Sequence, residues 1–124
     1  MKHTRPKNLN LFTIHFPIPA IVSILHRISG FVLFLIIPLL LWMLNASLSS
    51  MESFDALQAY LAEPFIKFIL WGSLSAFIFH LVAGVRHLLM DGGVGESLKG
   101  SRIGSWSTIA ISLILIILTG IWLW

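Results

Sequence analysis

The 124 residues would suffice for one soluble domain, but 57% of them are hydrophobic, only 10% are charged, and the mean hydropathy is +0.94. This composition lies well outside that of soluble proteins and predicts an all-α integral membrane protein. Cysteine is absent, which excludes a disulfide framework, a thiolate metal site and a thioether-linked haem, and the net charge of +3 reflects a few basic residues at helix ends rather than a nucleic-acid surface.

Three stretches are long enough to cross about 30 Å of hydrocarbon at about 1.5 Å per residue. They are residues 21–44, 65–90 and 105–124. Little of the chain is left outside these spans, so residues 1–124 are expected to form one membrane-anchor domain. Any soluble chemistry would then belong to a partner.

The first span is preceded by a basic segment and by a proline pair. Residues 1–10 carry Lys2, Arg5 and Lys7 and no acid, which predicts a cytoplasmic N-terminus. The sequence F-P-I-P-A then marks the helix start, with Pro19 in the first turn, and Pro38 further on predicts a kink.

A signal peptide is the alternative interpretation of the first span, because its apolar part is followed by Asn-Ala-Ser. The long polar segment before it and the adjacent His26 and Arg27 argue against that interpretation.

The rest of the chain supports one orientation. Residues 45–63 are amphipathic and acidic, Pro64 starts the second helix, and residues 91–104 form a predicted flexible loop. With Arg27 and Arg86 near helix ends, seven of the eight Lys and Arg residues lie on the cytoplasmic side. The distribution predicts a cytoplasmic N-terminus and a periplasmic C-terminus. The third span has no ionisable residue and is predicted to be packing material.

His80 is the most informative residue of the second span. Counted back from Met90 at about 1.5 Å per residue, it lies roughly 15 Å into the membrane, where an imidazole is costly unless paired or ligated. Its helix face is otherwise small, with Ser73, Ala76, Ala83 and Gly84. This arrangement favours a haem with His80 as an axial ligand. A structural histidine bonded to a neighbouring helix is the alternative.

Cations follow two turns further along the same helix. Arg86 and His87 are placed where haem propionates would emerge toward the interface. A second haem on His87 would call for matching histidines on another helix. His26, the other helical candidate, is expected to lie level with His87 rather than with His80. The second axial ligand for His80 is therefore expected from another chain.

A second cluster lies at the start of the first span. Ser23 and Arg27 are four residues apart and point the same way, and Gly30 is expected to clear space beside them. A hydroxyl and a guanidinium of this kind can hold a quinone carbonyl and offset negative charge on it. The alternative is that Arg27 anchors the helix at lipid headgroups.

Two motifs carry a resemblance to a known family. H-R-I-S-G at residues 26–30, preceded by R-P at 5–6, and H-x-x-x-G-V-R-H-L-x-x-D at 80–91 resemble the cytochrome b556 subunits of succinate dehydrogenase, the larger membrane anchor of bacterial complex II. The resemblance spans nearly the whole chain. The stretch F-P-I-P-A-I-V-S-I-L-H-R is especially similar to enterobacterial members.

The resemblance implies roles for particular residues. Ser23 and Arg27 would line the ubiquinone site, and His80 would be a haem b ligand whose opposite ligand comes from the smaller anchor subunit. Positions around the haem propionates would be His26, Arg86 and His87. Asp91, at the cytoplasmic end of the second helix, is a candidate proton relay; the alternative is a helix cap or a solvated charge.

The resemblance further implies an assembly in a bacterial inner membrane. A flavoprotein subunit would oxidise succinate, an iron-sulfur subunit would carry electrons, and the two anchors would form one helical bundle and serve haem and quinone. The chain would thus belong to an enzyme without performing its dehydrogenation. A fumarate reductase anchor and a cofactor-free membrane anchor or assembly protein remain alternatives.

Overall fold

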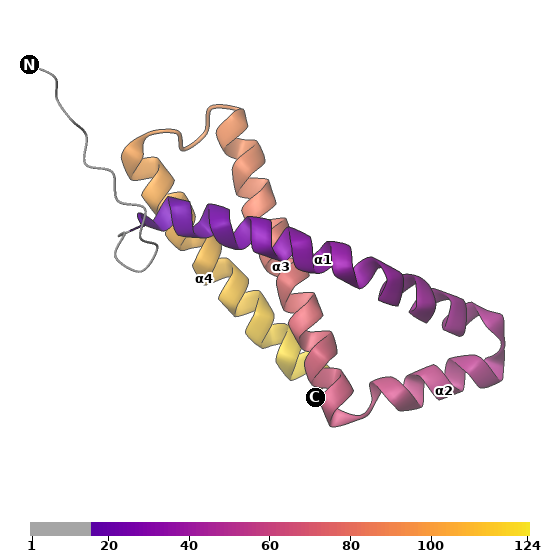
Figure 1. Ribbon diagram of the computed structural model, residues 1–124. Coiled ribbons are helices and arrows are strands. Elements are labelled where there is room, and N and C mark those ends of the chain that lie inside the picture. Colours follow the sequence, from indigo (N-terminus) through magenta and orange to yellow (C-terminus); the bar gives the residue numbers. More distant parts are fainter. Residues whose placement is uncertain (1–15) are drawn as a thin grey trace, which may run out of the picture.

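The computed structural model describes residues 16–124, and this part of the chain is all helical (Figure 1). The helices are α1 (Ile18–Ser49), α2 (Met51–Leu61), α3 (Pro64–Asp91) and α4 (Leu98–Leu123). By length and composition, α1, α3 and α4 can each cross a membrane. The predicted all-α membrane fold is confirmed. The basic N-terminal segment, with Lys2, Arg5, Lys7 and the R-P pair, lies outside the described residues.

Prolines begin two of the helices, as predicted. Pro17 is extended, α1 begins at the next residue, and Pro19 lies in its first turn. Pro64 is the first residue of α3. A proline in the first turn loses no hydrogen bond, because the amide there has no intrahelical partner. Pro38, by contrast, lies inside α1, which continues through it to Ser49.

A separate short helix follows α1 without a long connection. Ser50 is extended and caps α2, its hydroxyl accepting a 3.0 Å hydrogen bond from the backbone N–H of Ser53. The Ser53 hydroxyl in turn donates to the carbonyl of Ala46 in α1 at 2.7 Å. These bonds fix α2 at the far end of α1 (Figure 1).

The connection between α3 and α4 is shorter than predicted. Gly93 and Gly95, with φ of 90° and 72°, turn the chain. The Ser97 hydroxyl accepts from the N–H of Gly100 at 3.0 Å and caps α4, which begins at Leu98. The predicted loop at residues 98–104 is wrong, because this cap starts the helix before its glycines.

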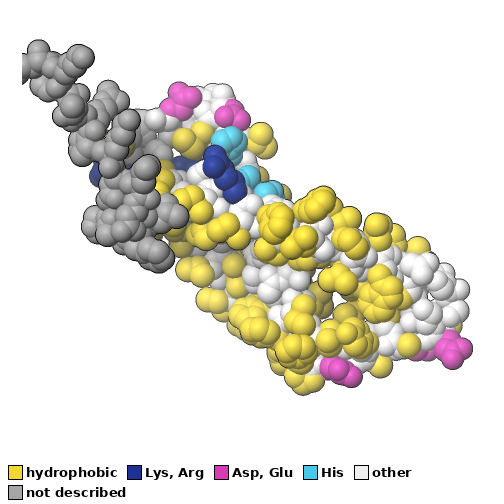
Figure 2. Space-filling model, in the orientation of Figure 1, with side chains coloured by type: hydrophobic (Ala, Val, Ile, Leu, Met, Phe, Trp, Pro, Cys, Tyr) yellow, Lys and Arg dark blue, Asp and Glu magenta, His cyan; other side chains and the backbone are white. Residues whose placement is uncertain are grey.

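The buried side chains are small apart from Leu57 of α2, and most large apolar side chains face outward, where many are visible in Figure 2. The buried residues in the described part of the chain are Val22, Leu57, Ala83, Ser29, Ser105, Thr108 and Ser112. In a membrane, apolar surface gives helices little reason to associate, so small residues that allow close backbone approach form the contacts. Small residues inside and large apolar residues outside are the arrangement expected of a membrane-spanning bundle.

Trp71 joins α3 to the last turns of α4. Its indole N–H donates to the carbonyl of Ile116 at 2.9 Å, and its ring lies edge-on to Trp124 with 6.3 Å between centroids. A Cβ added at Gly120 would lie 3.1 Å from the indole. The C-terminus is therefore held beside the first half of α3 (Figure 1). Thus α4 positions α3 as well as filling space.

Candidate functional site

The polar cluster of α1 meets His80 of α3. Ser29 is buried, with 7% of the residue exposed. Its hydroxyl donates to the His26 carbonyl at 2.7 Å. His80 Nδ1 lies 3.0 Å from Ser29 Oγ and 3.1 Å from the same carbonyl. Two oxygens from one helix therefore hold one nitrogen of the His80 imidazole.

His26 lies against the face of that imidazole. The two rings are parallel within 7° and their centroids are 4.1 Å apart. The prediction that His26 lies level with His87 rather than with His80 is therefore wrong. It assumed parallel helices and counted residues from the membrane surface, whereas α1 crosses α3 at an angle (Figure 1).

Two glycines make the helix crossing close enough for this stack. A Cβ at Gly30 would lie 2.9 Å from Cε1 of His80, and one at Gly84 would lie 3.6 Å from Nε2 of His26. The prediction that Gly30 clears space beside Ser23 and Arg27 is wrong, because that space holds the His80 imidazole. The face of α3 with small side chains packs against α1, with Gly84 beside His26.

This arrangement fits a haem ligand. Within residues 16–124, the hydrogen-bond partners of His80 all lie at Nδ1, so Nε2 is the nitrogen that can bind iron. His80 would hold the iron through Nε2, because the stacked His26 covers only one face of the ring. The parallel rings of His26 and His80 do not direct their nitrogens at one common point, so His26 does not complete a ligand pair with His80.

A pocket of about 260 Å³ joins the two predicted clusters. It is lined by residues from α1 and α3: Val22, Ser23, His26, Arg27, Ala83, Arg86 and His87. The basic and histidine side chains gather near one end of the molecule (Figure 2). The volume lies below the range of about 300–1,000 Å³ usual for a complete ligand pocket. Ser23 and Arg27 are exposed, so other subunits can complete the site.

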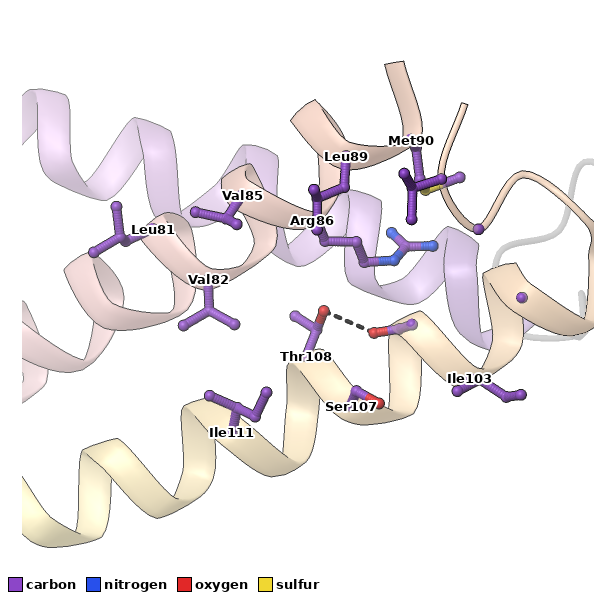
Figure 3. Close-up of a pocket in the computed structure, with 14 residues that line it drawn as sticks. Leu81, Val82, Val85, Arg86, Leu89, Met90, Ile103, Ser107, Thr108 and Ile111 are labelled. Carbon is purple, nitrogen blue, oxygen red and sulfur yellow. Dashed lines mark hydrogen bonds between the residues drawn. The ribbon is translucent and has the colours of Figure 1, made fainter. Parts of the chain in front are cut away.

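Arg86 is directed toward α4. Its Nη2 donates to the carbonyl and hydroxyl of Ser101, both at 3.3 Å, and a Cβ at Gly104 would lie 3.2 Å from its Nε. That Nε is buried and has no partner among the described residues. Arg86 also lines a second, largely apolar pocket of about 660 Å³ between α3 and α4 (Figure 3). Its guanidinium is therefore anchored between the two pockets.

The last turn of α3 carries an exposed pair. His87 Nε2 lies 3.8 Å from a carboxylate oxygen of Asp91, four residues on, and their side chains are 72% and 66% exposed. An ion pair this exposed contributes little to stability. Asp91 ends the helix beside the pocket that His87 lines.

Comparison with known proteins shows the family. Residues 1–119 match the model of the succinate dehydrogenase/fumarate reductase transmembrane subunit. The chain belongs to this family. Membership makes it a transmembrane subunit of a succinate dehydrogenase-type complex, and it confirms the resemblance that the two motifs carried.

Individual members of this family are similar along nearly their whole length. The succinate dehydrogenase cytochrome b556 subunit of Coxiella burnetii is 49% identical, with both chains covered completely. The subunit of the same name from Paracoccus denitrificans is 37% identical over 93% of this chain and 88% of its own. That from Rickettsia prowazekii is 35% identical over 92% and 89%. The likeness thus includes all three long helices.

Ser29 is a site residue that the sequence did not single out. Ser29 belongs to the H-R-I-S-G motif, but no role was predicted for it from the sequence. It is one turn from His26 and adjacent to Gly30. A serine beside a glycine in an apolar helix can mark a close helix crossing. Only the crossing itself brings its hydroxyl to His80.

Proposed function

We propose that the chain helps to bind haem b and to form the quinone-reduction site of a succinate:quinone oxidoreductase. The observation that carries the proposal is the fixed imidazole of His80, whose Nδ1 is held by two oxygens of α1. A histidine with one nitrogen held and the other available is the usual arrangement of a metal ligand. When bound, haem b would supply a one-electron redox centre inside the membrane.

In this proposal, His80 would hold the haem iron through Nε2, and the smaller anchor subunit would supply the second ligand. The histidine pair within this chain cannot form both bonds, which supports a ligand from outside it. Arg86 and His87 supply positive charge or hydrogen-bond donors toward the propionates, together with His26. Arg86 and His87 both line the small pocket between α1 and α3, which supports a cationic lining there.

Ser23 and Arg27 are proposed to bind the headgroup of ubiquinone. Both line the small pocket between α1 and α3, and both are exposed. The hydroxyl donates to one carbonyl oxygen, and the guanidinium donates and offsets negative charge. Because reduction of a quinone takes up two protons, a site near the aqueous boundary is favourable, and we propose that Asp91 passes protons toward it.

The remaining partners follow from the proposed reaction. A flavoprotein subunit would oxidise succinate, and an iron-sulfur subunit would deliver electrons on the cytoplasmic side. The chain would lie in a bacterial inner membrane with its N-terminus in the cytoplasm and its C-terminus in the periplasm. The Lys and Arg distribution supports this orientation. A fumarate reductase anchor has the same scaffold, and the direction of flux depends on the partner subunits.

The test is the optical and redox spectrum of the purified complex carrying His80→Ala. We expect the low-spin b-type signal to disappear or convert, and haem binding to require co-expression of the smaller anchor. Phe77→Ala is the control, because it removes an exposed aromatic ring from the same helix and should keep the low-spin signal. An unchanged six-coordinate spectrum in His80→Ala would return His80 to a structural role and favour a cofactor-free anchor.

A further inference from the structure

From the contacts around His80, we infer that Ser29 is a positioning residue that, together with the backbone carbonyl of His26, holds one tautomer of this histidine and raises its basicity toward haem iron. The inference rests on the proposed role of His80. It adds a hydroxyl that contacts neither the iron nor the quinone and acts through the imidazole.

The first step is the direction of the hydrogen bonds. The Ser29 hydroxyl donates its single proton to the His26 carbonyl across 2.7 Å, and this carbonyl can only accept. Ser29 Oγ then presents lone pairs to His80 Nδ1 at 3.0 Å, and the carbonyl presents another at 3.1 Å. A nitrogen facing two acceptors carries the proton. The neutral His80 is therefore the Nδ1–H tautomer, with its lone pair on Nε2.

The second step concerns the reverse arrangement. If the Ser29 proton pointed at Nδ1, the lone pair of Nδ1 would face it, and the His26 carbonyl would lose that donor. The carbonyl oxygen would also lie 3.1 Å from a nitrogen without a proton. Both consequences are unfavourable for groups removed from water. The buried position of Ser29 leaves no bulk solvent to compensate.

The third step is the rigidity of the imidazole. Gly30 lies against Cε1, the atom between the two ring nitrogens, at a separation that leaves no room for a Cβ. The stacked ring of His26 covers one face. Rotation of the His80 ring is thus opposed at its edge and its face, so Nδ1 stays at the oxygens and Nε2 keeps one direction.

The chemical consequence follows from donation at Nδ1. A ligating imidazole that donates its other N–H is a more basic ligand, and such outer partners typically change metal affinity by about 10- to 100-fold. A more basic ligand stabilises ferric iron relative to ferrous iron. Loss of the Ser29 acceptor should therefore raise the haem midpoint potential and weaken haem retention.

The experiment uses the assembled complex with Ser29→Ala and the control Ser75→Ala. Ser75 is also a helix serine whose hydroxyl donates to a carbonyl of its own helix, that of Trp71 at 2.7 Å, and within residues 16–124 none of its hydrogen bonds is to an imidazole. We expect Ser29→Ala to raise the midpoint potential and to lose haem roughly tenfold faster on dilution. Ser75→Ala should match the unmodified complex.

Equal potentials and equal haem retention in Ser29→Ala and Ser75→Ala would overturn the inference. If Ser29→Ala does not assemble, Ser29→Cys keeps the volume but offers a weak acceptor, and the same rise in potential is expected. A wild-type midpoint potential in Ser29→Cys would then reject the inference about Ser29. His80→Ala distinguishes failure of the ligand assignment from failure of the positioning role. If this variant leaves the haem spectrum unchanged, the assignment of His80 as a ligand fails. If it abolishes the low-spin signal while the Ser29 variants match the control, only the positioning role fails.

Discussion

The imidazole rings of His26 and His80 lie parallel, with 4.1 Å between their centroids. The stack links the proposed haem ligand to the proposed quinone pocket, which were predicted from the sequence as separate clusters. The link arises because His26 also lines the pocket that contains Ser23 and Arg27. A shift of α1 relative to α3 would thus change the orientation of the proposed haem ligand and the shape of the proposed quinone pocket together.

His26→Ala should leave haem bound but less uniformly oriented. The backbone carbonyl that holds His80 Nδ1 remains after the substitution, whereas the ring covering its face is removed. We expect a broadened low-spin electron paramagnetic resonance signal in the assembled complex. His26→Phe keeps an aromatic face and should narrow the signal again; equal line widths in all three proteins would show that the stack does not orient the ligand.

Gly30→Ala should disrupt the helix crossing at His80. The new Cβ would lie 2.9 Å from Cε1 of that residue, and overpacking of this kind typically costs about 1–3 kcal/mol. Gly72→Ala is the matched control, since nothing lies within 4 Å of its added Cβ. Haem retention during a thermal ramp of the purified complex should fall for Gly30→Ala alone. Identical melting of the two variants would contradict the tight crossing.

Substitutions in the small pocket should separate quinone reduction from succinate oxidation. Ser23→Ala would leave a quinone carbonyl without its proposed donor. It should reduce the rate of quinone reduction by roughly 5- to 150-fold, equivalent to about 1–3 kcal/mol. Arg27→Leu should reduce it at least as much, because a donor and a charge are lost. Arg27→Lys should not restore it, because the planar guanidinium is absent.

The measurement for these pocket variants compares two electron acceptors in intact complex. A dye that accepts electrons upstream should support full succinate oxidation, while ubiquinone should not. If Ser23→Ala and Arg27→Leu work equally well with both acceptors, the quinone assignment fails and Arg27 is better explained as a headgroup anchor.

The orientation can be tested with single cysteines, because the chain has none of its own. Gln58 of α2 and Glu96 of the α3–α4 connection are both exposed. In intact cells with a permeable outer membrane, an impermeant maleimide should label Gln58→Cys and spare Glu96→Cys until the inner membrane is opened. The opposite labelling pattern would reverse the proposed topology.

The helix starts could be predicted where they depend on local chemistry. Pro19 and Pro64 act through their own rings, and the structure has them in the first turns of α1 and α3. The start of α4 was missed because the surrounding sequence is rich in glycine, which suggested a loop. The cap from Ser97 to Gly100 begins the helix despite those glycines.

The site was predictable in kind but not in arrangement. An imidazole in an apolar span pointed to His80 as a ligand candidate, since burial of a polar ring needs a reason. Its partners depend on the angle at which two helices cross, which no residue count supplies. Ser29 and the His26 stack were missed for that reason, and the contact of Arg86 with Ser101 likewise depends on how α3 packs against α4.

The placement of small side chains inside the bundle has a consequence for which substitutions the chain tolerates. In a water-soluble bundle, exchanges of large apolar residues are the harmful ones and surface positions vary freely. Here Leu113 and Ile117 of α4 are 54% and 57% exposed, whereas Ser105 is fully buried. Leucine and isoleucine should therefore interchange almost silently at positions facing lipid, while one added methylene at Ser105 would separate the helices. A deep mutational scan should show the most restricted positions among the smallest residues.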